Sequence, residues 1–314
     1  MMVTGCAGFI GSHLVERLLD EGHDVLGIDA FTSYYERADK ERNVAGFADD
    51  PRFTLLEADL ATTDIGAVAT GRDAIFHLAA QPGVRASFGE GFAEYVHHNV
   101  LATQRVFEGA IEAGVRRVVW ASSSSVYGDA EAYPTVEATT PTSPRSPYGV
   151  TKRSCEDLAG VYRSRGLELV GLRYFTVYGP RQRPDMAFRR LCEAAVHGHV
   201  FPLFGDGSQS RDFTYVTDAV DATYRAALAD EIAPIYNVGG GEESTLADAI
   251  DLLESIAGRP IALERHGSQV GDVRRTAADT TLARTMLGWA PETSLADGLA
   301  AAYAWVEERA LSIA

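Results

Sequence analysis

The sequence predicts an α/β protein, with a doubly wound parallel sheet and a second, smaller lobe whose segments interleave with the sheet. Three observations support this prediction. Short β-rich runs alternate with helical patterns through the first half of the 314 residues, a glycine-rich turn joins the first strand to the first helix, and the regular alternation ends near residue 180. Strand, helix and strand in repeated order produce a parallel sheet with helices on both faces.

The first half contains most strands of this sheet. The β-rich runs lie at 1–5, 24–29, 53–60, 74–80 and 116–125, and the clearest helical patterns lie at 12–22 and 93–114. The runs near 74–80 and 118–122 are apolar almost throughout, as expected of strands buried on both faces. The first strand is short, because only four residues precede Gly5, where about five or six are usual. An upstream start of translation would explain this.

A smaller lobe is expected beyond the run at 167–180. Turns that contain glycine or proline occupy 201–213 and 237–244, and helical patterns lie at 245–258 and near the C-terminus. We therefore expect two domains that exchange segments: residues 1–175 plus 212–238 form the sheet domain, and residues 176–211 plus 239–314 form the lobe.

The acidic composition restricts the partners of the protein. The formal net charge is −16, and such a chain repels nucleic acid and anionic membrane surfaces. No run approaches the roughly 18 to 20 apolar residues of a membrane span, and the N-terminus lacks a signal pattern, so we expect a cytoplasmic protein. Cys6, Cys155 and Cys192 lie far apart, without the spacing of a metal site or a disulfide framework.

Gly5, Gly8 and Gly11 lie between the first strand and the first helix. Such a turn lets the backbone approach a pyrophosphate closely, and the helix N-terminus offers N–H groups and a positive dipole end. Eighteen residues after Gly11, Asp29 ends the next strand, where its carboxylate can accept hydrogen bonds from both hydroxyls of an adenosine ribose. Asp29 would repel a 2′-phosphate, and no arginine follows it immediately, so NAD is favoured over NADP. The alternative, a purely structural turn, is disfavoured by this pairing.

A tyrosine and a lysine four residues apart form a second motif. Tyr148 and Lys152 fall within a helical pattern, so their side chains project from one helical face. A tyrosine has an ordinary pKa of about 10 and is a poor base at neutral pH, but a nearby ammonium and a positive nicotinamide favour the phenolate. A hydroxyl from the serine run at 122–125 can hold the substrate oxygen that loses or gains the proton.

These motifs resemble those of the extended short-chain dehydrogenase/reductases, the NAD-dependent nucleotide-sugar epimerases and dehydratases, from about Val3 to beyond Asp279. The resemblance implies a Rossmann-like sheet domain that binds NAD, and a smaller lobe that binds substrate. It also implies that the catalytic residues are Ser123, Tyr148 and Lys152. The cofactor contacts that it implies are Gly5, Gly8, Phe9, Ile10, Gly11, Asp29, Asp59, Leu60, Leu78, Ala79, Ala80, Asn99, Tyr148, Lys152 and Tyr174.

The same resemblance suggests contacts to the nucleotide of a UDP-sugar. Arg211 matches an arginine that grips the diphosphate, Phe204 looks like the side chain that packs on uracil, and Asp272 looks like a ribose ligand. UDP-glucose 4-epimerases carry a further diphosphate arginine at the position of Gln269, and Arg274 is the residue expected to compensate for it.

The enzymes that this chain resembles all begin by oxidising the sugar at C4, and they differ in the chemistry that comes after this oxidation. The 4,6-dehydratases have an Asp-Glu pair directly after the catalytic hydroxyl, and the UDP-glucuronate decarboxylases have Glu at the second of these positions. Here these positions hold Ser124 and Ser125, so both reactions are disfavoured and 4-epimerisation remains. UDP-glucose 4-epimerases usually have Asn at the position of Thr176.

The segments 82–88 and 175–186, with the serine run, most resemble those of the UDP-glucuronate 4-epimerases. That resemblance implies that Arg183 binds the sugar carboxylate and that other polar side chains line the substrate pocket: Arg85, Ser124, Ser125 and Thr176. Glucuronate oxidised at C4 is a β-keto acid that loses CO₂ readily, and a planar guanidinium with two hydrogen bonds can restrain its carboxylate.

Arg181 and Arg183 also have a simpler alternative, in which they are solvated loop charges or pair with Asp185. The sequence gives Arg181 no assigned role.

The sequence therefore predicts conversion of UDP-glucuronate to UDP-galacturonate through a 4-keto intermediate, with UDP-glucose epimerisation as the alternative. A non-catalytic NAD-binding sensor or scaffold is a minor alternative, because such proteins commonly lose the tyrosine or the lysine, and this chain retains both. The helical patterns at 93–114 and 148–164 carry more apolar residues than one buried face requires. Because the equivalent helices form a dimer bundle in the family that it resembles, we expect a homodimer.

Overall fold

A seven-stranded parallel sheet forms the centre of the computed structural model, which describes residues 1–267 and 273–313. The strands run in the order β11-β6-β5-β4-β1-β2-β3, and each neighbouring pair is parallel. They are β1 (Met2–Thr4), β2 (Val25–Asp29), β3 (Phe53–Glu57), β4 (Ala74–His77), β5 (Arg117–Ser123), β6 (Glu168–Tyr174) and β11 (Ile235–Val238). The predicted α/β class with a doubly wound sheet is confirmed.

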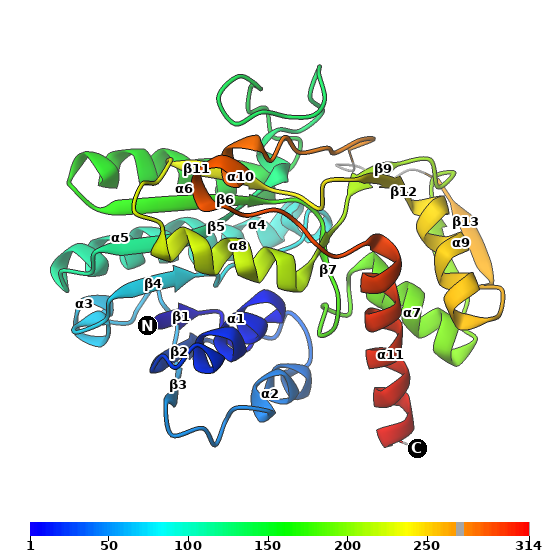
Figure 1. Ribbon diagram of the computed structural model, residues 1–314, viewed down its shortest axis with the longest axis horizontal. Helices are drawn as coiled ribbons and strands as arrows, with labels where there is room; N and C mark the ends of the chain where they lie inside the picture. Colours follow the sequence, from blue (N-terminus) through cyan, green and yellow to red (C-terminus); the bar gives the residue numbers. More distant parts are fainter. Residues whose placement is uncertain (268–272, 314) are drawn as a thin grey trace.

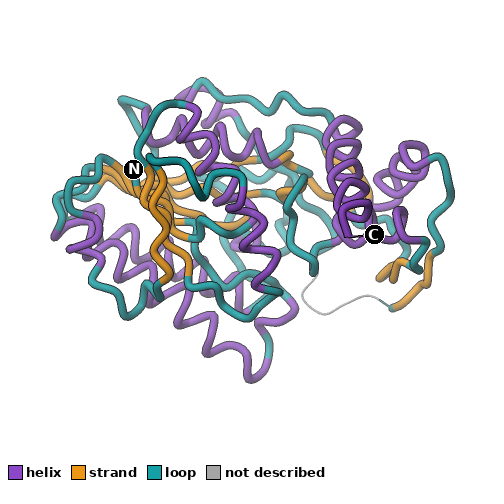
Figure 2. Tube along the Cα trace, turned by 90° about the horizontal axis from the view of Figure 1, so that it is seen from below, coloured by secondary structure: helices purple, strands orange, loops and turns teal. Residues whose placement is uncertain are grey.

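Helices cover both faces of the sheet, as Figures 1 and 2 show. One face packs on α1 (Phe9–Asp20), α8 (Val216–Leu228) and α10 (Thr281–Leu287), and the other packs on α3 (Ile65–Ala69), α5 (Ala102–Glu112) and α6 (Pro147–Ser164). Alternate side chains of β5 enter the two cores: Val119 packs in the first, and Val118 and Trp120 pack in the second. This alternation explains why the sequence of β5 is apolar almost throughout.

The remaining helices of the sheet domain lie on the connections between strands. α2 (Arg37–Ala45) follows β2, and α4 (Phe92–Tyr95) leads through a π-helical segment, η3 (Val96–Leu101), into α5. Three short 3₁₀ segments, η1 (Arg85–Ser87), η2 (Gly89–Gly91) and η4 (Ser124–Val126), follow β4 and β5.

A smaller lobe gathers α7 (Ala187–His197), α9 (Leu246–Ala257) and α11 (Leu295–Ile313) on one side of the sheet domain, at the right of Figure 1. Its core contains Leu191, Phe201, Leu253 and Val306. Short strand pairs complete it: β8 (Phe201–Phe204) with β13 (Leu263–His266), and β9 (Ser210–Asp212) with β12 (Glu243–Thr245). A third pair, β7 (Val177–Tyr178) with β10 (Thr214–Tyr215), lies where the chain passes between the two parts.

The division into 1–175 plus 212–238 and 176–211 plus 239–314 remains a proposal. α10 lies in the second group by sequence, yet Ala283 and Leu287 pack in a core of the sheet domain together with Trp289. Among the helices in the described parts of the chain, none combines the length and the apolar composition needed to cross a membrane.

The strand order reverses beside β1, because β2 and β3 follow on one side of it and β4, β5 and β6 follow on the other. In open parallel sheets, ligands bind outside the carboxyl ends of the strands at such a switch point. The segments that leave β1 and β4 at this point contain Gly5 and Leu78.

Candidate active site

A cavity of about 420 Å³ opens at the switch point of the sheet. It is lined by residues from the carboxyl ends of β1, β2, β4, β5 and β6, from α6, and from the segment after β7. Most residues singled out from the sequence line it: Gly5, Gly8, Phe9, Ile10, Gly11, Asp29, Asp59, Leu60, Leu78, Ala79, Ala80, Ser123, Ser124, Ser125, Tyr148, Lys152, Tyr174, Thr176 and Arg183.

The glycine turn is closely packed. The Gly8 N–H donates a 3.0 Å hydrogen bond to the Gly5 carbonyl, and α1 begins at the next residue. A Cβ on Gly11 would overlap the Gly5 carbonyl, and a Cβ on Gly5, whose φ is +73°, would lie 2.8 Å from the Ala79 nitrogen. The N-cap residue of α1 is Gly8, which has no side chain to cap the helix. The turn therefore leaves backbone N–H groups at the cavity wall, which suits a pyrophosphate.

Asp29 ends β2 and is 8% exposed. Its carboxylate accepts hydrogen bonds from the N–H groups of Ala7 at 3.2 Å and Phe31 at 2.8 Å, which fix its orientation. The Lys40 ammonium, from α2, lies 3.7 Å from Asp29 and also lines the cavity. Burial lowers the pKa of Lys40, and the Asp29 carboxylate opposes that shift. The sequence offered no motif that marked Lys40.

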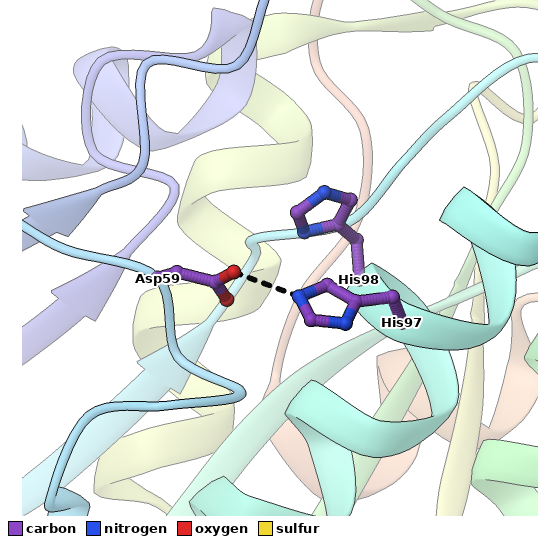
Figure 3. A group of neighbouring side chains, drawn as sticks. All are labelled: Asp59, His97 and His98. Carbon is purple, nitrogen blue, oxygen red and sulfur yellow. Dashed lines mark hydrogen bonds and ion pairs between the residues drawn. The ribbon is translucent and has the colours of Figure 1, made fainter.

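Asp59, His97 and His98 form a cluster beside the cavity (Figure 3). His97 Nε2 lies 2.7 Å from Asp59 Oδ2, and Asp59 and His98 line the cavity. Burial acts to raise the pKa of Asp59, but the hydrogen bond from His97 lowers it overall. One ligand atom from each of the three lies within 4.8 Å of the others, so this cluster could hold a metal ion. The spacing of residues in the sequence does not predict this cluster, because Asp59 is distant in the chain from the two histidines.

Asn99 lies beside the cavity but is not one of its lining residues. Its side chain is 1% exposed and accepts a 2.7 Å hydrogen bond from the Gln81 N–H. It donates to the Gln81 carbonyl at 3.1 Å and to Thr151 Oγ1 at 3.0 Å. Asn99 therefore holds the segment after β4, including the cavity residue Gln81, against α6.

The Tyr148 and Lys152 side chains reach the cavity from the first turns of α6. Ser146 caps this helix, since its Oγ accepts a 3.1 Å hydrogen bond from the Gly149 N–H, and Pro147 occupies the first helical position. Ser123, at the carboxyl end of β5, accepts a 3.1 Å hydrogen bond from the Ser125 N–H. The arrangement brings a phenol, an ammonium and a hydroxyl to one cavity, which is the set that proton transfer at an alcohol carbon requires.

Arg183 lines the cavity, and its guanidinium is already paired with Asp185. The sequence leaves this pairing open as the simpler alternative to binding of the sugar carboxylate. Arg181 does not line the cavity. Its φ is +62°, and its guanidinium bonds Glu16 of α1 at 2.6 Å. Arg181 therefore ties the segment after β7 to the sheet domain.

Arg211, which is expected at the diphosphate of the substrate, lies outside the lining of the main cavity. A smaller recess of about 170 Å³ is lined by Arg211 and Val273, and it shares the side chains of Ser124, Ser125 and Thr176 with the main cavity. The Arg211 guanidinium donates to the carbonyls of Ser210 at 2.8 Å and Val273 at 2.7 Å. The recess therefore continues the cavity toward the smaller lobe.

Arg85, Phe204 and Arg274 line neither the cavity nor the recess. Arg85 stacks over the Phe204 ring, with 4.7 Å between its Cζ and the ring centroid. This contact joins the loop after β4 to β8 of the smaller lobe. Asp272 and Gln269 lie outside the described residues.

Comparisons with known proteins agree on one family. Residues 1–239 match the sequence profile described as the NAD dependent epimerase/dehydratase family. A Bacillus subtilis (strain 168) protein named as an uncharacterized UDP-glucose epimerase, YtcB, is 44% identical over 302 residues, which are 95% of each chain.

Two solved structures are also similar. The UDP-glucuronic acid 4-epimerase from Bacillus cereus, in complex with UDP-glucuronic acid and NAD, is 39% identical over 98% of this chain and 99% of that chain, with a TM-score of 0.94. MoeE5, in complex with UDP-glucose and NAD, is 38% identical over 99% of both chains, with a TM-score of 0.89. MoeE5 has also been solved with UDP-glucuronic acid and NAD.

Proposed function

This chain belongs to the NAD-dependent epimerase/dehydratase family, and on that premise we propose that it is an isomerase that converts UDP-glucuronate to UDP-galacturonate. One observation carries the proposal. A single cavity is lined by the glycine turn, Asp29, the pair Tyr148 and Lys152, and the guanidinium of Arg183. The first two features suit a dinucleotide, the pair suits proton transfer at an alcohol, and the guanidinium suits an acidic sugar.

We propose that the glycine turn holds the pyrophosphate of NAD and that Asp29 accepts hydrogen bonds from the adenosine ribose. The absence of space for a Cβ at Gly5 and Gly11, and the uncapped start of α1, support this assignment. The other proposed cofactor contacts are Asp59, Leu60, Leu78, Ala79, Ala80 and Tyr174, all of which line the cavity. NAD, when bound, supplies the acceptor and then the donor of the hydride at C4 of the sugar.

Tyr148, as phenolate, accepts the proton of the C4 hydroxyl, and Lys152 stabilises the phenolate by its positive charge. Ser123 holds the C4 oxygen by a hydrogen bond. The 4-keto sugar turns about its diphosphate, and Tyr148 returns the proton to the oxygen when C4 is reduced on its opposite face. Ser124, Ser125 and Thr176, which border both the cavity and the recess, support a sugar position between the cofactor and Arg211.

Arg183 supports UDP-glucuronate as the substrate. A guanidinium bound to the sugar carboxylate recognises the acidic sugar, and it restrains the carboxylate from the orientation in which a β-keto acid loses CO₂. Two observations favour UDP-glucose as the second candidate: the relative at 44% identity is named as a UDP-glucose epimerase, and Arg183 is neutralised by Asp185.

Incubation of the purified protein with NAD and with UDP-glucuronate or UDP-glucose, followed by chromatographic identification of the products, tests the proposal. UDP-galacturonate is the expected main product, and the variant Tyr148→Phe should form none. Epimerisation of UDP-glucose alone would make the sugar assignment wrong. A decarboxylated or dehydrated product would make the reaction assignment wrong, and equal activity of Tyr148→Phe would remove the role of Tyr148.

We also propose a homodimer formed through α6 and the helix from Phe92 to Glu112. Large apolar side chains exposed on these elements support it: Phe92, Val96, Leu101, Val150 and Val161. Large apolar side chains exposed on neighbouring elements suit an interface between subunits. Light scattering after size-exclusion chromatography should give twice the chain mass, and Val161→Asp should yield the monomer. A monomeric parent protein would contradict the proposal.

A further inference from the structure

The guanidinium of Arg183 is held by Asp185 through two hydrogen bonds. Arg183 Nε donates to Asp185 Oδ1 and Nη2 donates to Oδ2, both at 3.0 Å. The Tyr34 hydroxyl donates a 3.3 Å hydrogen bond to Asp185 Oδ2, and the Arg183 guanidinium lies over the Tyr34 ring, 5.9 Å from its centroid. The carboxylate therefore has hydrogen-bond partners on two segments, Arg183 on its own segment and Tyr34 on the segment after β2.

Arg183 and Tyr34 line the cavity, whereas Asp185 does not. The Arg183 side chain is 17% exposed, and that of Asp185 is 41% exposed. Burial acts to lower the pKa of Arg183, but attraction to Asp185 raises it overall. Asp185 thus supplies a negative charge at the cavity wall without taking space from a ligand.

The pair has opposite consequences for two kinds of sugar. When a neutral sugar occupies the cavity, Asp185 compensates a guanidinium that would otherwise be a largely buried, unpaired charge, and such charges are costly. When an acidic sugar enters, its carboxylate must share Arg183 with Asp185 or displace it, and two carboxylates near one guanidinium repel each other. Asp185 should therefore weaken the preference for the acidic sugar on both accounts.

We propose that Asp185 sets the sugar specificity of the cavity, by substituting for the carboxylate of the substrate at Arg183 and so admitting neutral UDP-sugars beside acidic ones. The proposal rests on the proposed UDP-sugar function and extends it to the breadth of specificity. It also accounts for an arginine in the cavity of a chain whose relatives include proteins named as a UDP-glucose epimerase and as a UDP-glucuronate 4-epimerase.

The test compares the dissociation constants of UDP-glucuronate and UDP-glucose, measured by calorimetry on NAD-loaded protein that carries Tyr148→Phe to prevent turnover. Asp185→Asn keeps the shape of the side chain and removes its charge. This substitution should tighten the binding of UDP-glucuronate and weaken the binding of UDP-glucose, so that the ratio of the two dissociation constants changes by about tenfold or more. If Asp185 had a purely structural role, Asp185→Asn would instead weaken the binding of both UDP-sugars together.

Glu16→Gln is the matched control, because Glu16 pairs with Arg181 on the same segment and does not line the cavity. It should leave the ratio unchanged. In an Arg183→Gln background, Asp185→Asn should also leave the ratio unchanged, because the competing guanidinium is then absent. Asp185→Ser serves as a second variant if Asp185→Asn folds poorly.

An unchanged ratio in folded Asp185 variants, or an equal loss of both sugars, overturns the proposal. So does the same change in the Arg183→Gln background, or a failure of both sugars to bind the NAD-loaded protein. Turnover by the protein with its native Tyr148 separately tests the proposed function, since an altered binding ratio without epimerisation would sustain the role of Asp185 and contradict the reaction.

Discussion

Lys152 Nζ donates a 2.8 Å hydrogen bond to the carbonyl oxygen of Ala121. Ala121 lies in β5, two residues before Ser123, and Lys152 lies in α6, one turn after Tyr148. Because the Lys152 side chain is buried at this contact, one bond fixes the helix that carries the phenol against the strand that carries the hydroxyl. The ammonium thus has a structural role in addition to the electrostatic one proposed for it.

Lys152→Met should lower kcat by about 10²- to 10⁴-fold, because it removes the ammonium that favours the phenolate. Steady-state kinetics with UDP-glucuronate provides the measurement. Ser154→Ala, on the same helix and outside the cavity lining, is the control and should retain activity. A parent-like kcat in the folded Lys152→Met variant would remove the role proposed for the ammonium.

Gly11→Ala should destabilise the protein by about 1–3 kcal/mol or more, because its Cβ would overlap the Gly5 carbonyl and the turn cannot absorb it. The same shift should weaken NAD binding at least about tenfold. Urea unfolding and cofactor titration measure the two effects. Gly160→Ala, in α6 with open space around its Cβ, should instead stabilise the protein by about 0.5–1 kcal/mol. If the two variants had equal unfolding free energies and equal affinities for NAD, the close packing at the glycine turn would have no role in stability or cofactor binding.

The fold, the glycine turn, Asp29 and the pair Tyr148 and Lys152 follow from local sequence patterns, whereas most other predicted residues of the cavity follow from the family resemblance. The strands were evident from apolar runs and the helices from their periodicity, and topology then brings the carboxyl ends of parallel strands to one edge. Gly5, Asp29 and Ser123 meet there because each ends or follows a strand. The meeting of these three residues at one edge of the sheet can therefore be predicted without knowing how side chains pack.

The unpredicted features depend on packing between segments distant in the chain. Lys40 reaches Asp29 only because α2 folds back over the end of β2, and Asp59 meets His97 across 38 residues. The position of α10 on the sheet domain has the same origin. Local spacing does suggest that Asp185 can reach Arg183, but whether the pair forms depends on the surroundings that Tyr34 provides.

Glu156→Ala should destabilise the protein by about 3–5 kcal/mol, because it leaves a buried guanidinium unpaired. Glu156 and Arg173 form a two-point ion pair with side chains 11% and 5% exposed, and Glu156 also accepts a 2.6 Å hydrogen bond from Ser122 Oγ. Denaturant unfolding measures the effect. Glu21→Ala removes the exposed partner of Arg17 and should cost less than about 1 kcal/mol. A similar small cost at Glu156 would contradict the importance of burial.

His13 should make stability depend on pH. Burial and, to a smaller extent, the Arg181 charge together lower the pKa of His13 to about 4, although its hydrogen bond to the Pro180 carbonyl opposes the shift. The unfolded chain has a histidine pKa of about 6.5 and binds a proton before the folded protein does. The free energy of unfolding is therefore unaffected by the titration of His13 above about pH 6.5. As the pH falls from there toward 4, it decreases progressively, by at most about 3 kcal/mol, because the unfolded chain takes up the proton first.

His13→Gln removes this proton uptake and keeps an N–H group that can bond the Pro180 carbonyl. The difference in unfolding free energy between the parent protein and the variant should be constant above about pH 6.5, then move in favour of the variant as the pH falls to about 4. Urea unfolding at several pH values measures it. A constant difference for His13→Gln over the whole range would show that His13 titrates alike in the folded and unfolded chains.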